Sequence, residues 1–460
     1  MKRVITLLLI SLCSGIILHA QKWQKQFPAF TKASQSLKVD IVDKYNAWAL
    51  AMPIADAPQY FLPGNYYTRT TDGGETWVTN ALPSGYSGDL SNLTAISADK
   101  AWIGLQDYQS DTNGVAMVFR TKDGGQNWEK LNLQLNSYIN MVHFFDENDG
   151  IVMGDPIGDE FQIFTTSDGG DTWQQVPSQD MPKAIDSGEL GLNFDSYGTN
   201  ANSLVFDTYY NRLFVTRDRG KHWGILEPSI SGEGLTWFPH LDEDNNLYLP
   251  LYYPPKDTTD VWGATYMLQK YNLDDDTSWT DITPVDNKYY VSGFSSIPDG
   301  PTIVMNTVFK TLVSYDRGVH WLELSTTTTP FGFMSFYDSG IGYSVKLPDL
   351  TDRLNNPCDE FYKYNGSPLT GLIHQKPLDA QISIGPNPVM SVLNINVKTA
   401  EAQHYAILIH DLSGKLFKTM ETDKLSTIGV SVNVQDLPAG AYTLSISCQT
   451  GSKTIPFVKQ

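Results

Sequence analysis

The sequence is poor in cysteine and in long apolar segments, and each shortage narrows what the chain can be. Its 460 residues include three cysteines. That number excludes a small fold stapled by disulfides, so stability must come from packing. Cys358 and Cys448 fall in regions that we expect to be different domains, and we expect them to stay unpaired. Beyond the first twenty residues, no stretch is long and apolar enough to cross a bilayer.

Basic residues are also scarce, with 32 Lys and Arg against 51 Asp and Glu. A negatively charged surface repels the phosphate backbone of nucleic acids, which excludes nucleic-acid binding as a main function. No Gly-x-Gly-x-x-Gly follows an expected strand and no Cys/His cluster is present, so a dinucleotide-dependent redox enzyme is unsupported. We expect no cofactor and no metal, with a calcium-stabilised scaffold as a weaker alternative.

The first twenty residues have the pattern of a secretory signal peptide. Two basic residues precede an apolar run over residues 4–18, and Ala20 supplies the small residue before the cleavage point. Leu12 is larger than the residue that lipoprotein processing requires before Cys13, which disfavours a lipid anchor. Removal of residues 1–20 takes away two basic residues and no acidic ones, so the mature chain is more acidic still.

One short motif recurs six times between residues 70 and 321. Its copies are TTDGGETW (70–77), TKDGGQNW (121–128), TSDGGDTW (166–173), TRDRGKHW (216–223), the worn NLDDDTSW (272–279) and SYDRGVHW (314–321). The motif Asp positions are 42 to 56 residues apart. Recurrence at such a period is the signature of a repeat architecture.

Each copy reads as the tight turn of a β-hairpin. The Asp side chain accepts hydrogen bonds from its own turn, Gly supplies a positive φ, and the Trp packs back over the turn. One catalytic site needs no sixfold repetition, so we interpret these residues as structural, including His222 and His320, which replace a Thr. The structural set is Asp72, Trp77, Asp123, Trp128, Asp168, Trp173, Asp218, Trp223, Asp316 and Trp321.

The motif resembles the Asp-box, or BNR repeat, which in the families that carry it joins the third and fourth strands of a β-propeller blade. Two further strand-like segments lie between copies, as in INMVHFF–DENDG–IVMGD (139–155). Four strands per period are typical of a propeller blade. We predict seven blades within residues 21–365, with the segment from Trp23 to Phe27 supplying the outer strand of the seventh.

The pattern changes after Asn365. We predict a linker at residues 366–381 and a small Ig-like β-sandwich at residues 382–460, so the whole chain is all-β. The segments PNP (386–388), DLSGK (411–415) and LPAGAY (437–442) resemble the type A C-terminal sorting domain of type IX secretion. The resemblance implies that the type IX machinery is a partner. It also implies export across the outer membrane to an extracellular or cell-surface location.

Ligand sites of propellers usually lie on the face opposite such turns, on the second-to-third-strand loops and the loops between blades. Here those loops are rich in Asp, Tyr and Pro, and loops on a rigid scaffold are where function concentrates. Aromatic rings there would stack on sugars, and carboxylates would bind hydroxyl groups or a cation; the alternative is that these are solvated acidic loops. The candidate binding residues are Tyr60, Asp107, Tyr108, Asp159, Tyr252, Tyr253 and Trp262.

One segment raises the question of catalysis. Asp155 ends an expected second strand and Glu189 precedes an expected first strand, so both should approach the central channel on one face. The run around them resembles a group of secreted Asp-box propellers related to photosystem II stability factors, whose oxidoreductase-like and glycosyl-hydrolase-like labels establish no reaction. Asp155 and Glu189 are candidates for an acid/base pair acting on a glycan, or for backbone caps.

Two other enzyme classes fit less well. A sialidase needs three convergent arginines, but outside the motif copies and their flanks only Arg212 and Arg353 remain. A polysaccharide lyase would use His143 or His240, yet lone histidines on apolar strands are usually core or channel residues. Our first hypothesis is a non-catalytic propeller that binds an extracellular glycan or protein. The alternative is a glycan-active enzyme, hydrolase before lyase, using carboxylates at the channel face.

Overall fold

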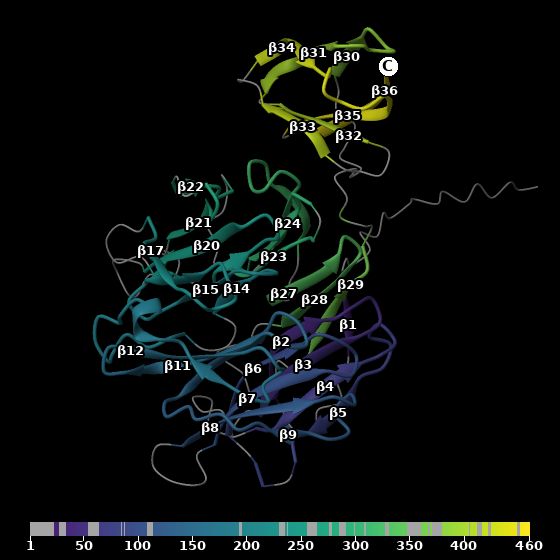
Figure 1. Cartoon of the computed structure of the whole chain (residues 1–460). Coiled ribbons are helices and arrows are strands. Elements are labelled where there is room, and N and C mark those ends of the chain that lie inside the picture. The colour runs from purple at the N-terminus through teal and green to yellow at the C-terminus, as the bar shows by residue number, and fades with distance from the viewer. Residues whose placement is uncertain are drawn as a thin grey trace, which may run out of the picture.

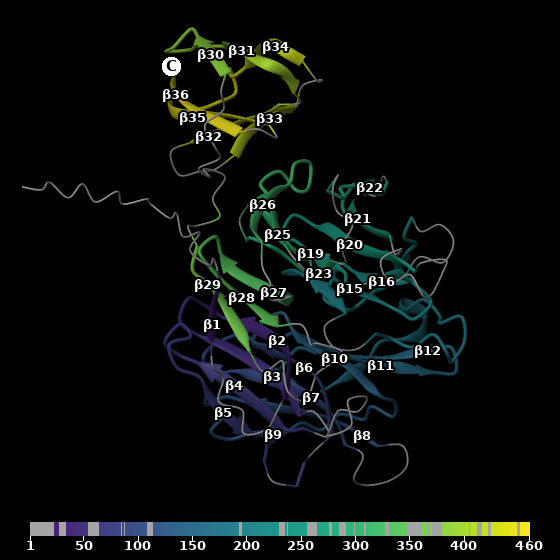
Figure 2. The same cartoon turned by 180° about the vertical axis from the view of Figure 1, so that it is seen from behind.

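Strands dominate the structure, which is a computed structural model drawn in Figures 1 and 2. It describes residues 23–26, 34–53, 64–83, 85–86, 88–107, 114–192, 196–229, 235–236, 238–254, 265–275, 278–284, 291–298, 300–307, 310–326, 331–346, 360–366, 369, 380–403, 405–411, 416–421, 425–448 and 451–460. Within these ranges the only helix is one 3-10 turn, Ser178–Asp180. The prediction of an all-β chain is therefore confirmed.

The described residues up to Tyr364 form seven antiparallel sheets, each with four strand positions. The first strands are β2 (Ser34–Ile41), β6 (Gly88–Ala95), β10 (Ile139–Phe144), β14 (Tyr197–Thr199), β18 (Leu235–Thr236) with β19 (His240–Leu241), β23 (Val291–Ser296) and β27 (Phe331–Asp338). The second strands are β3 (Ala47–Pro53), β7 (Ala101–Asp107), β11 (Gly150–Ile157), β15 (Leu204–Asp207), β20 (Asn246–Tyr253), β24 (Ile303–Thr307) and β28 (Ile341–Lys346).

The third and fourth strands complete each sheet. The third strands are β4 (Tyr66–Thr70), β8 (Val115–Thr121), β12 (Glu160–Thr166), β16 (Leu213–Thr216), β21 (Thr265–Asn272), β25 (Lys310–Ser314) and β29 (Phe361–Tyr364). The fourth strands are β5 (Val78–Ala81), β9 (Glu129–Lys130), β13 (Gln174–Gln175), β17 (Gly224–Leu226), β22 (Thr280–Asp281), β26 (Leu322–Thr326) and β1 (Trp23–Gln26). Five of these sheets place a complete motif copy in the turn between the third and fourth strands.

The sheets fan out around a common centre, as Figures 1 and 2 show. Each of seven buried apolar clusters is shared by two consecutive sheets. One of these clusters joins Val39 and Trp77 of the first sheet to Tyr343 and Phe361 of the last. The ring is thus closed by the same apolar packing that joins every other pair of neighbours.

The N-terminal strand completes the last sheet. β1 pairs antiparallel with β29 in the register Trp23↔Tyr364 to Gln26↔Phe361, giving the order β1-β29-β28-β27. Trp23 is buried and meets Phe336 and Tyr364 edge to face, with ring centroids 6.0 and 5.5 Å apart. The predicted contribution of this segment to the last sheet is confirmed for residues 23–26.

The first strand of the fifth sheet is interrupted. Its position is taken by two short strands, β18 and β19, which pair with β20 separately. Phe238 lies between them with φ of 46°, a conformation that bulky residues rarely adopt. Pro239 follows and has no N–H to donate to the ladder. These two residues divide the strand.

The motif turns are bonded as the sequence suggested. In the third copy, Asp168 accepts from the backbone N–H and the hydroxyl of Thr172, at 2.9 and 2.6 Å, and from the hydroxyl of Thr166 at 2.8 Å. The Thr166 hydroxyl also accepts from the Gly170 N–H at 2.9 Å. The hydrogen bonds from Thr172 hold the pKa of Asp168 at about 2. The carboxylate is therefore fully used by its own turn.

The motif tryptophans pack over their own turns and also reach the neighbouring sheet. Trp223 donates its Nε1–H to the Gly220 carbonyl of its own turn at 3.0 Å, as predicted. Trp77 in addition meets Tyr343 and Phe361 of the neighbouring last sheet, with centroids 5.7 and 5.1 Å apart. Trp321 similarly donates its Nε1–H to the Ile282 carbonyl of the preceding sheet at 2.8 Å. The rings of Trp77 and Trp321 therefore each fasten two sheets together, which sequence spacing alone does not reveal.

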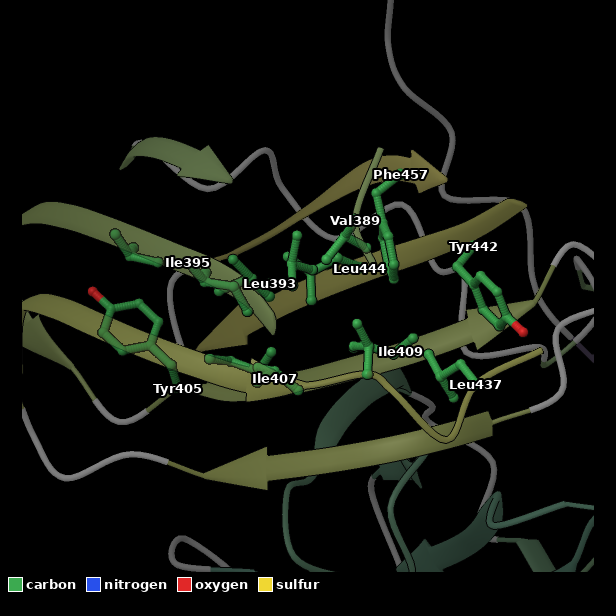
Figure 3. Close-up of a cluster of buried hydrophobic side chains, with 14 residues drawn as sticks. Val389, Leu393, Ile395, Tyr405, Ile407, Ile409, Leu437, Tyr442, Leu444 and Phe457 are labelled. Atoms are coloured by element: carbon green, nitrogen blue, oxygen red, sulfur yellow. The ribbon is translucent and has the colours of Figure 1, made fainter. Parts of the chain in front are cut away.

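The described residues from Ala380 onward form two further sheets. One has the order β30 (Ala380–Gly385), β31 (Val392–Gln403), β34 (Leu425–Asn433), and the other β33 (Leu416–Glu421), β32 (Ala406–Asp411), β35 (Gly440–Cys448), β36 (Gly451–Lys459). Both contribute to one buried core, with Leu393 and Ile395 from the first and Ile409 and Leu444 from the second (Figure 3). In the LPAGAY segment the Tyr442 hydroxyl donates to a backbone carbonyl four residues earlier, at 2.9 Å.

Candidate functional site

The two ends of the propeller sheets differ. At one end, the motif turn donates a backbone hydrogen bond to the first-to-second-strand turn of the same sheet, as from Gly73 to Tyr45 and from Gly124 to Asp99. We call this end the motif face. The opposite end, which we call the loop face, carries the second-to-third-strand turns and the connections between sheets, as an antiparallel order requires.

Arginines on the motif face bridge neighbouring sheets. Arg219 of the fourth sheet binds Asp146 and Asp149 of the third, at 2.5 and 2.6 Å. Buried Arg120 of the second sheet donates to the Gly169 carbonyl at 2.8 Å and binds Asp171 at 2.6 Å in the third. These guanidinium groups are committed to the scaffold, as we assumed when we set aside a sialidase.

Glu189 has no exposed surface. Its Oε2 accepts from Arg212 Nη1 at 2.6 Å and from the Ile185 N–H at 2.7 Å, and its Oε1 accepts from the Thr208 hydroxyl at 3.0 Å. A carboxylate without exposed surface does not contact a substrate. This geometry argues against the predicted catalytic role of Glu189 and gives it a role in holding the connection between β13 and β14.

Asp155 fastens the same connection. Its Oδ1 accepts from Asn140 Nδ2 at 2.6 Å and from the Gly191 N–H at 3.2 Å. Burial raises the pKa of Asp155, while these two hydrogen bonds lower it. A raised pKa suits a general acid, but the bond to Gly191 joins β11 to the segment that Glu189 anchors. The pair therefore fits the backbone-cap alternative.

The predicted binding residues that the structure describes lie at the loop face, but few of them project into solvent. Asp107 is buried at the end of β7, and Tyr252 packs against Tyr266 of β21, with ring centroids 5.4 Å apart and ring planes tilted by 36°. Tyr253 packs half-buried against the apolar cluster between the fourth and fifth sheets. Asp159 is partly exposed and pairs with a lysine at 2.6 Å. Tyr60, Tyr108 and Trp262 lie outside the described residues.

Five apolar and aromatic side chains that the sequence analysis did not identify are exposed on this face. Their exposed fractions are 64% for Ile185, 62% for Tyr209, 51% for Ile157, 42% for Tyr210 and 36% for Leu190. We call these five residues the loop-face patch. They belong to the end of β11, where the turn to β12 begins, to the β13–β14 connection and to the β15–β16 turn.

Hydrogen bonds join the three segments that carry the patch. The Tyr209 N–H donates to the Leu190 carbonyl at 3.0 Å, and the Tyr210 hydroxyl donates to Asp186 Oδ1 at 3.0 Å. The Ala184 N–H donates to the Asp159 carbonyl at 2.9 Å. A signal for the patch was present in the sequence, because AIDSGEL and TYYNR place apolar residues inside otherwise polar loops.

A cavity of about 230 Å³ lies between the first strands of five sheets. Its wall is mainly aromatic and polar, and includes Asp40, Tyr197, Thr199, Phe238, His240, Phe294, Ser295, Phe333, Met334 and Tyr343. His240 Nε2 accepts from the Ser296 N–H at 2.9 Å, and burial lowers the pKa of His240 to about 4. His143 Nε2 lies 3.1 Å from the Thr199 hydroxyl. Both histidines are thus bonded within the first strands.

The described residues show neither a metal-binding cluster nor a membrane-spanning helix. No group of three or more His, Cys, Asp and Glu side chains that could hold a metal ion occurs among them. They also contain no helix with the length and apolar character that a membrane span requires.

Known sequence families match two parts of the chain. Residues 116–260 match the family described as sortilin, neurotensin receptor 3, and residues 383–460 match the secretion system C-terminal sorting domain. The photosystem II stability/assembly factor HCF136 of Oryza sativa subsp. japonica is 27% identical over 197 residues. That alignment covers 41% of this chain and 43% of the rice protein, so the chain spans less than half of that relative's length.

Solved structures show the same fold. The structure titled YCF48 bound to D1 peptide has a TM-score of 0.53 at 14% identity, covering 76% of this chain and 99% of that one. YCF48 from Cyanidioschyzon merolae has a TM-score of 0.53 at 16% identity, covering 75% and 99%. The chain therefore has a β-propeller fold, is similar over part of its length to a photosystem II stability/assembly factor, and carries a C-terminal sorting domain that directs it through type IX secretion to the outer membrane or extracellular space.

Proposed function

We propose that the mature protein is a secreted, non-catalytic binding propeller whose loop face takes an extracellular glycan or protein partner. The observation that carries this proposal is the loop-face patch, a set of exposed apolar and aromatic side chains on segments fixed by buried hydrogen bonds. Exposed apolar patches on a secreted protein mark interaction sites. The motif face offers a ligand fewer groups to bind, because its carboxylates and guanidinium groups are already bonded within the scaffold.

The same proposal includes the finer architecture. Residues 1–20 would be a signal peptide and residues 21–365 a seven-bladed Asp-box propeller. Residues 366–381 would form a linker, and residues 382–460 an Ig-like sorting domain. The seven sheets and their seven shared apolar clusters support this division.

The alternative of a glycan-active enzyme loses support. It needs Glu189 or Asp155 to reach a substrate, and Glu189 has no exposed surface. The order of the hypotheses made from the sequence therefore stands, with binding ahead of hydrolysis.

A binding screen with one variant for each face tests the proposal. Mature protein is screened against a glycan array and a phage-displayed random peptide library. A loop-face variant (Tyr209→Ala with Tyr252→Ala) is compared with a motif-face variant (Tyr45→Ala with Lys122→Ala). We expect ligands whose binding weakens only in the loop-face variant. Loss of binding only in the motif-face variant, or no ligand of either class, would refute the proposal.

A further inference from the structure

We infer that the loop-face patch is a docking surface for a polypeptide segment in which apolar side chains are flanked by Lys or Arg. This inference rests on the proposed function and names the class of partner. Three features of the patch carry it: the kind of side chain exposed, the rigidity of the segments beneath, and the sign of the surrounding charge.

The exposed side chains suit a protein better than a sugar. Ile157, Ile185 and Leu190 are aliphatic and are 51%, 64% and 36% exposed. Aliphatic groups offer a sugar neither a flat ring face nor a hydrogen bond, whereas they bury readily against apolar side chains of a polypeptide. Tyr209 and Tyr210 are of the type that is enriched in protein interfaces.

The patch is held in place before any partner arrives. The Glu189–Arg212 ion pair lies beneath it, and Arg212 also stacks over the Phe214 ring, with its guanidinium carbon 5.2 Å from the centroid. The Tyr210 hydroxyl is bound to Asp186. Segments that are already ordered lose little conformational entropy on binding, which favours affinity.

The charges around the patch select a basic partner. Asp186, Glu160 and Glu227 are carboxylates of the same three segments or their flanks. The two cations here are already paired, since Lys183 binds Asp159 and Arg212 binds Glu189. Electrostatic complementarity sets orientation and partner choice at interfaces. A segment bearing Lys or Arg next to Leu, Ile or Phe therefore fits, and an acidic segment is repelled.

Peptides selected from a phage-displayed random library on the mature protein provide the probes. Each enriched peptide is synthesised with a fluorophore, and its anisotropy is followed with wild-type protein, with Ile185→Ala/Tyr209→Ala, and with Tyr45→Ala. Tyr45 is a matched control, because it is 54% exposed but lies on the motif face. All replaced side chains are more than half exposed, so the variants should keep the thermal unfolding midpoint of the wild type.

We expect enriched peptides that combine apolar and basic residues, and a loss of affinity of about tenfold or more in the double variant with no change in Tyr45→Ala. Acidic peptides, or peptides that bind the double variant as well as wild type, would overturn the inference. Neutral glycans that bind in place of peptides and require the patch would also overturn it, as a carbohydrate site. Peptides whose binding depends on Tyr252 and not on the patch would contradict this inference but would still support the proposed function.

Discussion

The ion pair between buried Glu189 and Arg212 holds the loop-face segments in place. Removal of Glu189 would leave the guanidinium of Arg212 without its main partner, and an uncompensated buried charge is costly. We therefore expect Glu189→Ala to lower the free energy of unfolding by about 3 kcal/mol in urea titrations. The matched control is Glu227→Ala, because Glu227 is 72% exposed and lies 3.9 Å from the same arginine.

The control variant should lose less than about 1 kcal/mol, as exposed ion pairs do. Equal losses for the two variants would contradict the assignment of Glu189 as the anchor of the β13–β14 connection. A selective loss of ligand binding in Glu189→Ala with no loss of stability would contradict it as well.

A histidine in the fourth motif copy gives that turn a pH dependence. The exposed ring of His222 lies with Nδ1 2.6 Å from Asp218 Oδ2, and this hydrogen bond raises the pKa of His222 above 6.5. A raised folded pKa means that the bond stabilises the turn fully below the unfolded pKa. That contribution is lost as pH rises through the folded pKa.

We expect the His222 ring resonance in an NMR titration to move with a midpoint above 6.5. We also expect His222→Thr, which restores the residue of other copies, to remove the change in amide protection factors of this turn that accompanies titration of the His222 ring, after correction for intrinsic base-catalysed exchange. A midpoint at or below that of free histidine would contradict the account.

The contribution of His240 to stability depends on pH in the opposite direction to that of His222. Burial lowers the pKa of His240 to about 4, so the unfolded chain takes up a proton before the folded one does. This group therefore favours unfolding as pH falls from the unfolded pKa toward 4. We expect its ring resonance to stay that of neutral imidazole down to about pH 5. Titration near 6.5 would show that the ring is not held in the first-strand packing.

The roles of single residues were harder to predict from the sequence than the strands and turns. Arg212 and Glu189 are far apart in the loop sequences, and only the packing of two connections brings them together. The same packing buries Glu189 and exposes Ile185, four residues away. The sequence pattern singled out the segment around Glu189 but could not decide between an acid/base role and a backbone cap, and the burial of Glu189 favours the cap. Motif aspartates were predictable because their partners lie within four residues.

At the level of elements, β1 is the strand with the largest expected effect on the fold. Trp23 is 1% exposed and packs against two aromatic rings of the last sheet. We expect Trp23→Ala to cost about 3 to 5 kcal/mol, as large-to-small core substitutions do. Calorimetry of the mature protein measures the resulting fall in unfolding temperature.

Lys25→Ala is the control on the same strand, since the Lys25 side chain is 39% exposed and pairs with Glu360. Its effect should be within about 1 kcal/mol. A Trp23 variant as stable as wild type would mean that β1 does not close the last sheet. Release of β1 would also expose the edge of β29, so aggregation should accompany a large loss.

Strands and turns were the level at which the sequence was most informative. Alternating apolar residues around Asx and Gly turns located the strands of INMVHFF–DENDG–IVMGD as β10 and β11. The break at Phe238 was missed, because a positive φ at a bulky residue depends on its tertiary surroundings. The contact of Trp77 with the neighbouring last sheet was missed for a similar reason, since it joins segments of different sheets.

At the level of the whole molecule, the propeller has a motif face whose polar groups are used by the scaffold and a loop face that we propose binds a partner. Hydrogen–deuterium exchange of the mature protein, with and without a peptide selected on it, tests this division most directly. We predict slower exchange over residues 184–191 and 207–212, with unchanged exchange in the six motif turns. Protection of the motif turns with no change at the loop face would contradict the central claim.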